Sequence, residues 1–207
     1  MLKPQMEQLP EALRPVLQQN WDQISAALDH VTSSPASFAD DLSRVLTGST
    51  FVAEQLGRNT EMLSNLLDSG DLYSDYDEDH YQQCLKTRFA SLETEEQLHT
   101  AVRCFRQREQ VRLIWRDLNR LSDMRTTTRE LSWLADACVE QTMNWLYLHA
   151  CERWGTPIGR DSKNPQRMVV LGMGKLGANE LNLSSDIDLI FVYPENGETE
   201  GSKKCLD

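Results

Sequence analysis

Three glycines and two aspartates lie close together in the stretch GMGKLGANELNLSSDIDLIF, which runs from residue 172 to residue 191. Asp186 and Asp188 flank Ile187 at the start of an apolar run, and the two-residue period of a strand would put both carboxylates on one face. Two like charges on one face repel each other, which is costly unless cations join them. Such a pair can help to hold two divalent ions ~3.5–4 Å apart for in-line displacement at phosphorus. The spacing therefore predicts a Mg²⁺ or Mn²⁺ site.

The glycines before this pair predict a phosphate-binding turn. Gly172 and Gly174 carry no side chain, so backbone N–H groups can approach phosphate oxygens at the start of a short helix. Lys175 adds a positive charge, although its spacing is not that of a Walker P-loop. A structural alternative remains, in which the glycines only make a tight turn and the acids cap a strand.

The same glycines also fit a dinucleotide-binding fingerprint. Gly172, Gly174 and Gly177 satisfy G-x-G-x-x-G, and Glu195 lies near the place of a ribose-binding acid. This alternative predicts an NAD(P)- or flavin-linked oxidoreductase. Only residues 178–185 separate the fingerprint from the next apolar run, which is short for the crossover between two parallel strands. The carboxylate pair therefore favours phosphate chemistry.

The rest of the chain must position this turn, and most of it has helical periodicity. Apolar residues at steps of three or four predict helices over about 9–28, from Ser37 onward, 50–67, 94–121 and 129–154. Capping-box patterns at Ser37/Asp40 and Thr94/Gln97 mark the starts of two of these helices. A short run, Met168 to Leu171, predicts a buried strand. We therefore predict an α+β fold, with a helical region over 1–158 and a second domain over 159–207.

One predicted helix carries a row of arginines, Arg108, Arg112, Arg116 and Arg120, at every fourth position. This row is interpreted as a solvated face that pairs with acidic surface, with a phosphate-binding ridge as the alternative. The acidic segment from Asp68 to His80 contains six acidic residues and no lysine or arginine, so it is predicted to be an exposed loop. A calcium-binding loop is the alternative, but the central glycine and the terminal glutamate of an EF-hand are absent from the spacing of its aspartates.

Composition narrows the class of protein. The formal net charge of −11 argues against general nucleic-acid binding. No apolar run approaches the length of a membrane span, and the N-terminus has no secretory signal, so we expect a cytoplasmic protein with no membrane partner. The five cysteines form no C-x-x-C pair, which predicts free thiols at the positions Cys84, Cys104, Cys138, Cys151 and Cys205.

The strand, glycine turn, short helix and D-x-D pattern resembles the nucleotidyltransferase superfamily, whose members have a β-polymerase-like palm. More narrowly, LGMGKLGANELNLSSDIDLIF, VRCFRQREQVRLIWRDL, SWLAD and NWLYLHACERWGTP resemble the N-terminal half of the bifunctional glutamine synthetase adenylyltransferase/adenylyl-removing family. The resemblance implies a helical N-terminal region followed by the start of a truncated palm. It also implies glutamine synthetase and a PII-type nitrogen-signalling protein as partners.

The resemblance further implies an adenylyl-removing reaction, in which orthophosphate attacks adenylyl-tyrosine and releases ADP. Asp186 and Asp188 match the metal ligands, and the positions that match phosphate- and nucleotide-binding residues are Gly172, Gly174, Lys175, Gly177, Ser184 and Ser185. Family members draw a third carboxylate from a later R-V-D-x-R-L-R-P-like segment and have a second, ATP-using adenylylating half. Neither occurs in these 207 residues, so the chain alone is expected to be inactive, and a non-catalytic helical interaction module stays an alternative.

Overall fold

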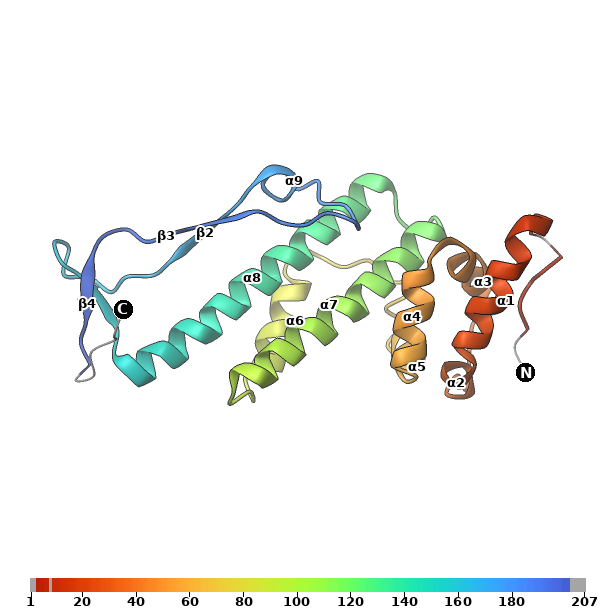
Figure 1. The fold of residues 1–207 in the computed structure, drawn as a ribbon, viewed down its shortest axis with the longest axis horizontal. Helices are drawn as coiled ribbons and strands as arrows, with labels where there is room; N and C mark the ends of the chain where they lie inside the picture. The colour runs from red at the N-terminus through yellow and green to blue at the C-terminus, as the bar shows by residue number, and fades with distance from the viewer. Residues whose placement is uncertain (1–2, 8, 202–207) are drawn as a thin grey trace. The chain divides into compact units, whose positions relative to one another are not determined.

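The computed structural model describes residues 3–7 and 9–201, and it divides the chain into two compact units. Unit 1 comprises Met1–Asp77 and Cys104–Glu130, and unit 2 comprises Glu78–Arg103 and Leu131–Asp207. Figure 1 gives the order of the elements along the chain. The helices before residue 78 are η1 (Glu11–Leu13), α1 (Arg14–Gln23), α2 (Ser25–Asp29), α3 (Phe38–Gly48), α4 (Thr50–Arg58) and α5 (Met62–Asp68).

The remaining helices are α6 (His80–Phe89), α7 (Glu95–Leu118), α8 (Met124–Trp154) and the one-turn α9 (Gly174–Gly177). The strands are β1 (Pro157–Gly159), β2 (Val169–Gly172), β3 (Leu189–Val192) and β4 (Gly197–Thr199). Both long helices contribute residues to each unit. The prediction of an α+β fold that is mostly helical is confirmed. None of the described helices is long and apolar enough to cross a membrane.

The core of unit 1 is built from α1 to α5 and one face of α7. Trp115 is fully buried, and its ring stacks on Phe38 at a centroid distance of 5.5 Å, while Tyr73 meets it edge-on at 6.3 Å. The apolar periodicity of the N-terminal residues predicted this packing face. The single predicted helix over 9–28 is instead divided into η1, α1 and α2, because Ile24 leaves helical geometry. Likewise, Asn59 separates α4 from α5.

The two predicted helix starts differ in their capping. At the start of α7, the Gln97 backbone N–H donates to Thr94 Oγ1 and the Thr94 N–H donates to Gln97 Oε1, both at 3.2 Å. This reciprocal pair confirms the predicted capping box. At the start of α3 the Ser37 side chain makes no capping bond and donates to Asp41 Oδ2 instead. The helix begins where it was predicted, without that box.

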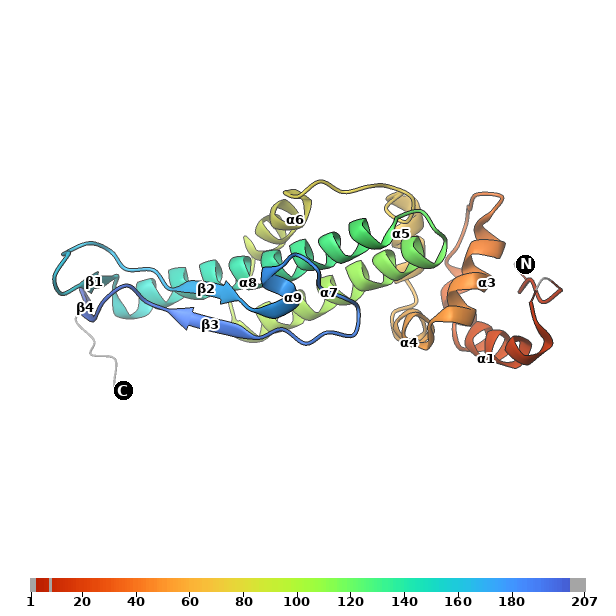
Figure 2. The same cartoon turned by 90° about the horizontal axis from the view of Figure 1, so that it is seen from above.

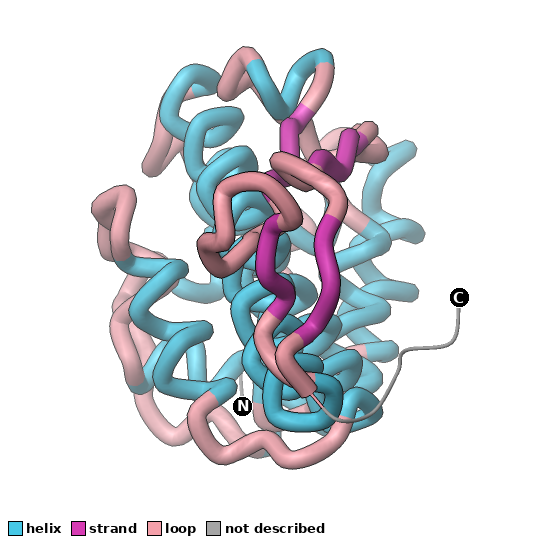
Figure 3. The backbone as a smooth tube through the Cα atoms, turned by 90° about the vertical axis from the view of Figure 1, so that its left-hand side faces the viewer, coloured by secondary structure: helices cyan, strands magenta, loops and turns pink. Residues whose placement is uncertain are grey.

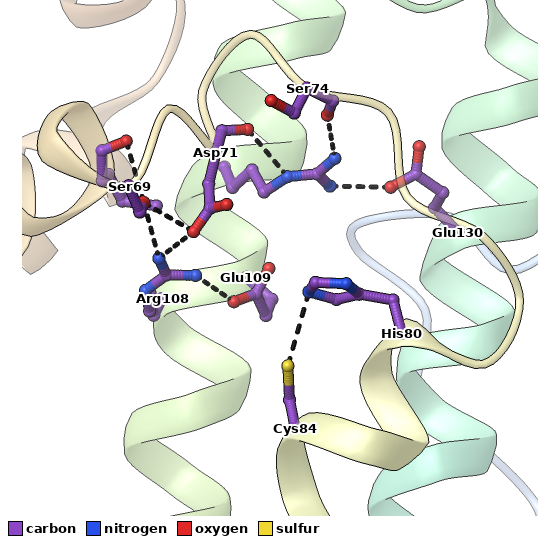
Figure 4. A network of polar contacts seen from close by, with 10 residues as sticks. Ser69, Asp71, Ser74, His80, Cys84, Arg108, Glu109 and Glu130 are labelled. Carbon is purple, nitrogen blue, oxygen red and sulfur yellow. Dashed lines mark hydrogen bonds and ion pairs between the residues drawn. The ribbon is translucent and has the colours of Figure 1, made fainter.

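The arginine row on α7 is mostly buried, so its interpretation as a solvated face is wrong for three of the four residues. Arg112 and Arg116 are 0% and 1% exposed, whereas Arg120 is exposed. Figure 4 shows the contacts of Arg108 with the segment that follows α5. Arg108 pairs with the carboxylates of Asp71 and Glu109.

Arg112 makes the most extensive contacts of the row. Its Nη1 pairs with Glu130 Oε2 at 2.7 Å, its Nε donates to the Asp71 carbonyl at 3.0 Å, and Nη2 donates to the Ser74 carbonyl. Its guanidinium also lies 3.4 Å above the centroid of the Tyr76 ring. Arg116 continues the series by pairing with Asp75. We call residues 69–76 the acidic strap, because the row of arginines fastens this segment to α7.

The segment from Asp68 to His80 was predicted to be an exposed loop; residues 69–79 do form a loop, but part of the acidic strap is buried. Leu72 is fully buried, and the Asp71 side chain is only 19% exposed. A turn around Gly70, whose φ is +75°, leads from α5 into the strap. Two of the acids that suggested solvent exposure, Asp71 and Asp75, pair with arginines of the row, whereas Asp77, Glu78 and Asp79 are exposed as predicted.

Unit 2 contains two small antiparallel sheets, each of two strands. β1 pairs with β4, and β2 pairs with β3. Figures 2 and 3 show β2 and β3 side by side, and Figure 2 shows α9 at one end of the pair. β2 was predicted to be buried, yet Val169 is 52% exposed and Leu171 is 47% exposed.

Two further predictions concern the free cysteines and the domain boundary. Cys84, Cys104, Cys138 and Cys151 form no disulfide in the part of the chain that the structure describes, and Cys205 lies outside the described residues. The change from helix to strand falls between Trp154 and Pro157, near the predicted boundary at residue 158. The compact units follow a different division, since α6 and part of α7 group with the strands.

Candidate active site

The candidate site lies at one end of the hairpin formed by β2 and β3. The strands run antiparallel, with Val169 opposite Val192 and Gly172 opposite Leu189. Beyond this last pair, the Met173 N–H donates to the Asp188 carbonyl at 2.9 Å. The backbone at Asp188 is therefore fixed directly against the start of the glycine turn.

Each position of the turn favours glycine for a different structural reason. Gly174 has a φ of +56°, in the left-handed region that residues with a Cβ disfavour. A Cβ on Gly177 would lie 2.4 Å from the Gly172 carbonyl oxygen, and one on Gly172 would lie 2.9 Å from Leu176 Cγ. Glycine therefore permits α9 to pack directly on the end of β2. The first N–H groups of this short helix have no acceptor within it, as at any helix start.

The turn is anchored by buried residues that the sequence did not single out as part of the site. Leu176 and Leu181 are 5% and 7% exposed. The Leu181 N–H donates to Ser132 Oγ at 3.1 Å, and Ser132 on α8 is fully buried. This bond ties the segment after α9 to the long helix within unit 2.

The two predicted metal ligands, Asp186 and Asp188, are separated by one residue and lie before the strand rather than within it. β3 begins at Leu189, so the prediction that Asp186 and Asp188 belong to the strand is wrong. Both side chains are exposed, and neither makes an ion pair or a side-chain hydrogen bond among the described residues. Lys175 is exposed as well. These charged groups are therefore available to solvent ions.

The two serines before the acids are held by a residue that sequence reasoning missed. Ser185 Oγ donates to Asn182 Oδ1 at 2.6 Å, and Ser184 Oγ lies 3.4 Å from the same atom. The Ser185 N–H also donates to the Asn182 carbonyl at 3.1 Å. The signal was present in the spacing N-x-S-S, because a short amide side chain commonly bonds polar groups two or three residues onward. Asn182 shapes the approach to Asp186.

The donor set suits Mg²⁺ only in part. Mg²⁺ is typically held by one or two carboxylates together with substrate phosphates and water, and Asp186 and Asp188 supply that minimum. Among the described residues, no group of three or more His, Cys, Asp or Glu side chains is arranged to hold a metal. The predicted site residues therefore supply at most part of the ligands that a Mg²⁺ site needs, and no complete cage.

The dinucleotide alternative does not fit this geometry. A dinucleotide-binding unit joins two parallel strands by a crossover helix, whereas β2 and β3 are antiparallel neighbours. The Glu195 carboxylate, which that alternative assigns to a ribose, accepts hydrogen bonds from the backbone N–H groups of Asp161 and Ser162. Hydrogen bonds from Ser162 and Asp161 lower the pKa of Glu195 below its ordinary value. The Glu195 carboxylate is therefore already bonded to the turn at Asp161 and Ser162.

Together, the fold and the site define an α+β protein whose helices carry an antiparallel hairpin with a glycine turn and two exposed carboxylates. The family model for glutamate-ammonia ligase adenylyltransferase matches residues 39–207. The chain belongs to this family.

Curated relatives agree with this assignment. A Pseudomonas aeruginosa protein named bifunctional glutamine synthetase adenylyltransferase/adenylyl-removing enzyme is 50% identical over 183 residues, covering 88% of this chain and 19% of the relative. Proteins of the same name from Pseudomonas syringae pv. tomato and Nitrosococcus oceani are 43% and 42% identical, covering 99% and 98% of this chain and 22% and 21% of the relatives. The chain thus spans about a fifth of the length of these relatives.

Proposed function

We propose that residues 159–207 begin the nucleotidyltransferase palm that removes adenylyl groups from glutamine synthetase. The observation that carries this proposal is the join between the glycine turn and the acids, where the Met173 N–H bonds the Asp188 carbonyl. A turn able to receive phosphate and a carboxylate able to bind a cation are thereby held next to each other. The relatives' names supply the substrate, which the geometry alone does not specify.

The residues of the turn have distinct proposed roles. Gly172, Gly174 and Gly177 let the backbone approach phosphate oxygens, and Lys175 contributes positive charge. Ser184 and Ser185, held by Asn182, border the path to the carboxylates. Asp186 and Asp188 would hold Mg²⁺ or Mn²⁺, which supplies charge neutralisation around phosphorus when bound. A longer polypeptide of this family would add the third carboxylate.

The proposed reaction is phosphorolysis of adenylyl-tyrosine. An oxygen of orthophosphate bonds to the α-phosphorus, and the bond between that phosphorus and the tyrosine oxygen breaks. The products are ADP and a tyrosinate, which takes a proton from solvent. The turn orients the phosphates for in-line attack, and no side chain needs to act as nucleophile. We assign adenylylation with ATP, and control by a PII-type protein, to further parts of a longer polypeptide of this family.

The proposal is tested by measuring Mn²⁺ binding to the 207-residue chain by electron paramagnetic resonance, with orthophosphate present. We expect weak but specific binding in the wild type, and its loss in the double variant Asp186→Asn, Asp188→Asn. Glu180→Gln, which changes a nearby exposed acid, is the matched control and should retain binding. Catalysis would then be measured in a longer polypeptide, as ADP formed from adenylylated glutamine synthetase and orthophosphate.

Two results would contradict the proposal. Equal Mn²⁺ binding by the wild type and the double variant would remove the metal site from these acids. Binding of glutamine synthetase with no metal binding would favour the second candidate, a helical interaction module. That candidate draws support from the extent of helix, which dominates the chain from residue 11 to residue 154.

A further inference from the structure

A second pocket lies within unit 2, away from the glycine turn. It has a volume of about 410 Å³ and is lined by parts of α8, the β1–β4 sheet and the segments that flank the β2–β3 hairpin. Its lining is predominantly apolar, with contributions from Pro157, Ile158 and Met168, and it includes the rings of Tyr147 and Tyr193. Pockets of this size with aromatic walls and a few polar groups are typical of small-molecule sites.

The two tyrosines give the pocket flat surfaces. The guanidinium of Arg167 lies over the Tyr147 ring, 4.6 Å from its centroid, and donates to Asn144 Oδ1 at 3.2 Å. Arg167 and Tyr147 therefore hold each other in place. Tyr193 is 60% exposed, so a large part of its ring has no protein covering. An aromatic ligand would gain stacking area on these rings.

The polar groups of the lining present an acceptor and a donor. Gln166 Nε2 donates to the Asn164 carbonyl at 3.0 Å and faces Glu195 Oε1 at 3.4 Å, and both partners are acceptors, which fixes the orientation of the amide. Gln166 Oε1 is consequently left buried with no hydrogen-bond partner among the described residues. Tyr193 Oη donates to Asn196 Oδ1 at 3.2 Å, which leaves the Asn196 Nδ2 group as a donor.

An unpaired buried acceptor costs about 1–3 kcal/mol, so a ligand that brings an N–H group to Gln166 would remove a penalty that the free protein carries. Gln166 Oε1 is covered in the free protein. The donor of the ligand would therefore reach it only after the Gln166 side chain changes its rotamer, as interface side chains commonly do on binding. The charges of the lining are one arginine against the two glutamates Glu195 and Glu198. This balance favours a neutral ligand over a polyphosphate.

The pocket is distinct from the candidate active site. It borders Met168 and Tyr193, at the end of the hairpin opposite Gly172 and Leu189. Asp188 and Tyr193 are five positions apart, which corresponds to about 16 Å along an extended strand. One nucleotide could not place its base in the pocket and its α-phosphorus at the carboxylates.

We propose that this pocket binds the purine ring of a neutral nucleoside, as a second site separate from the carboxylates. The rings of Tyr147 and Tyr193 stack on the base, Gln166 Oε1 accepts from its exocyclic amino group, and Asn196 Nδ2 donates to a ring nitrogen. A ring with one donor and adjacent acceptors matches this lining better than a purely hydrocarbon ring does.

The test uses adenosine as the probe, with the 207-residue chain in a metal-free buffer, and measures affinity by calorimetry and by amide shifts in NMR. We expect binding without divalent metal, and about tenfold weaker binding by Tyr193→Ala, because one stacking wall is lost. Tyr193→Phe keeps the ring and should lose less. Purine riboside, which lacks the amino group, should bind about tenfold more weakly than adenosine.

Asp186→Asn is the control that separates this pocket from the candidate active site, and adenosine affinity should not change in that variant. Tyr193 is exposed, so its replacement should leave folding intact, which circular dichroism checks. The inference is overturned if adenosine fails to bind, if Tyr193→Ala binds it as well as the wild type, or if Asp186→Asn abolishes binding. Failure of the wild type to bind Mn²⁺ would count against the proposed function and leave the purine pocket standing.

Discussion

Arg112 is the residue on which the acidic strap depends most. Its guanidinium is fully buried and contacts Glu130, two backbone carbonyls of the strap and the Tyr76 ring. A buried ion pair adds little net stability compared with an apolar pair, but removing one partner leaves an uncompensated charge. The consequence is an asymmetry in which the loss of Arg112 costs far more than the loss of an exposed arginine.

Arg112→Met should therefore lower the free energy of unfolding by about 3–5 kcal/mol. Arg120→Met, at an exposed position just beyond the end of α7, is the control and should change it by less than about 0.5 kcal/mol. Urea unfolding followed by circular dichroism measures both variants. Equal effects of the two substitutions would contradict the argument from burial.

The carboxyl of Asp71 reports on the same contacts through its pKa. Burial would raise this pKa, but hydrogen bonds from Ser69 and Arg108 outweigh burial and hold it below its ordinary value of 3.8. Because the folded pKa is lowered, the carboxylate stabilises the fold above pH 3.8 and this contribution is lost as the pH falls through the folded pKa.

In Arg108→Met, the cation is gone while most of the burial remains, so the pKa of Asp71 should rise toward or above its ordinary value. A carbon-detected NMR titration of the side-chain carboxyl measures this change directly. Arg106→Met, on an exposed part of the same helix, should leave the Asp71 titration unchanged. An unaltered Asp71 pKa in Arg108→Met would contradict the pairing seen in Figure 4.

Sequence reasoning saw the charges of this network but not their burial. A repeat of four residues aligns arginines on a helix, and it does so equally for a solvated face and for a buried row. Burial depends on the strap folding against α7 from a distant part of the sequence, and no local pattern encodes that approach. Asn182, in contrast, could have been found from the sequence, since its bonds to Ser184 and Ser185 follow from the local N-x-S-S spacing.

At the scale of elements, the glycine turn and α9 pack directly against the end of β2. The close approach between Gly177 and the Gly172 carbonyl leaves no room for a side chain. Gly174, in contrast, faces open space, because a Cβ at this position would meet no atom within 4 Å, so only its left-handed backbone conformation restricts the choice of residue. The two glycines should therefore respond differently to substitution.

Gly177→Ala should displace α9 from β2 and weaken the hairpin by roughly 1–3 kcal/mol. Gly174→Asn should be milder, because asparagine tolerates left-handed backbone better than other residues with a side chain. The readout is hydrogen exchange at the Met173 amide, which donates to the Asp188 carbonyl. Exchange that speeds up equally in both variants would argue against the close approach as the controlling contact.

The long helices and the first strand of the hairpin were predictable from the sequence, whereas the burial of their side chains was not. The Thr94/Gln97 box marked the start of α7, and glycine and proline after Trp154 marked the end of α8. The strand over 168–171 was found one residue from its actual bounds, because β-branched residues and the following glycines signal it locally. Its exposure could not be read from the sequence, since apolar residues show only what a strand could bury.

At the scale of the molecule, apolar surface is concentrated on the β2–β3 hairpin. Val169 and Val192 face each other across the ladder, as do Leu171 and Ile190, so the four side chains share one face. Each of them is at least 41% exposed, and Phe191 on the other face is 53% exposed. Exposed apolar patches of this kind mark contact surfaces.

The 207-residue chain should consequently bind a hydrophobic dye such as ANS, and a longer polypeptide of the family should bind less dye per hairpin. The double variant Leu171→Thr, Ile190→Thr should reduce dye fluorescence in the shorter chain, since both positions are already exposed. Leu148→Thr, an exposed leucine on α8 outside the hairpin, serves as the control. Equal fluorescence from the double variant and the wild type would place the dye elsewhere.

The acidic strap has one more consequence, for proteases. A segment rich in serine, glycine and aspartate between two helices resembles a preferred site of nicking. Proteases need several consecutive residues in an extended, accessible form, and the strap's backbone carbonyls at Asp71 and Ser74 are bonded to Arg112. Limited digestion with a protease of broad specificity should therefore spare residues 69–76 in the wild type and cleave there in Arg112→Met. The arginine row would thereby protect from proteolysis the segment whose composition most resembles a cleavage site.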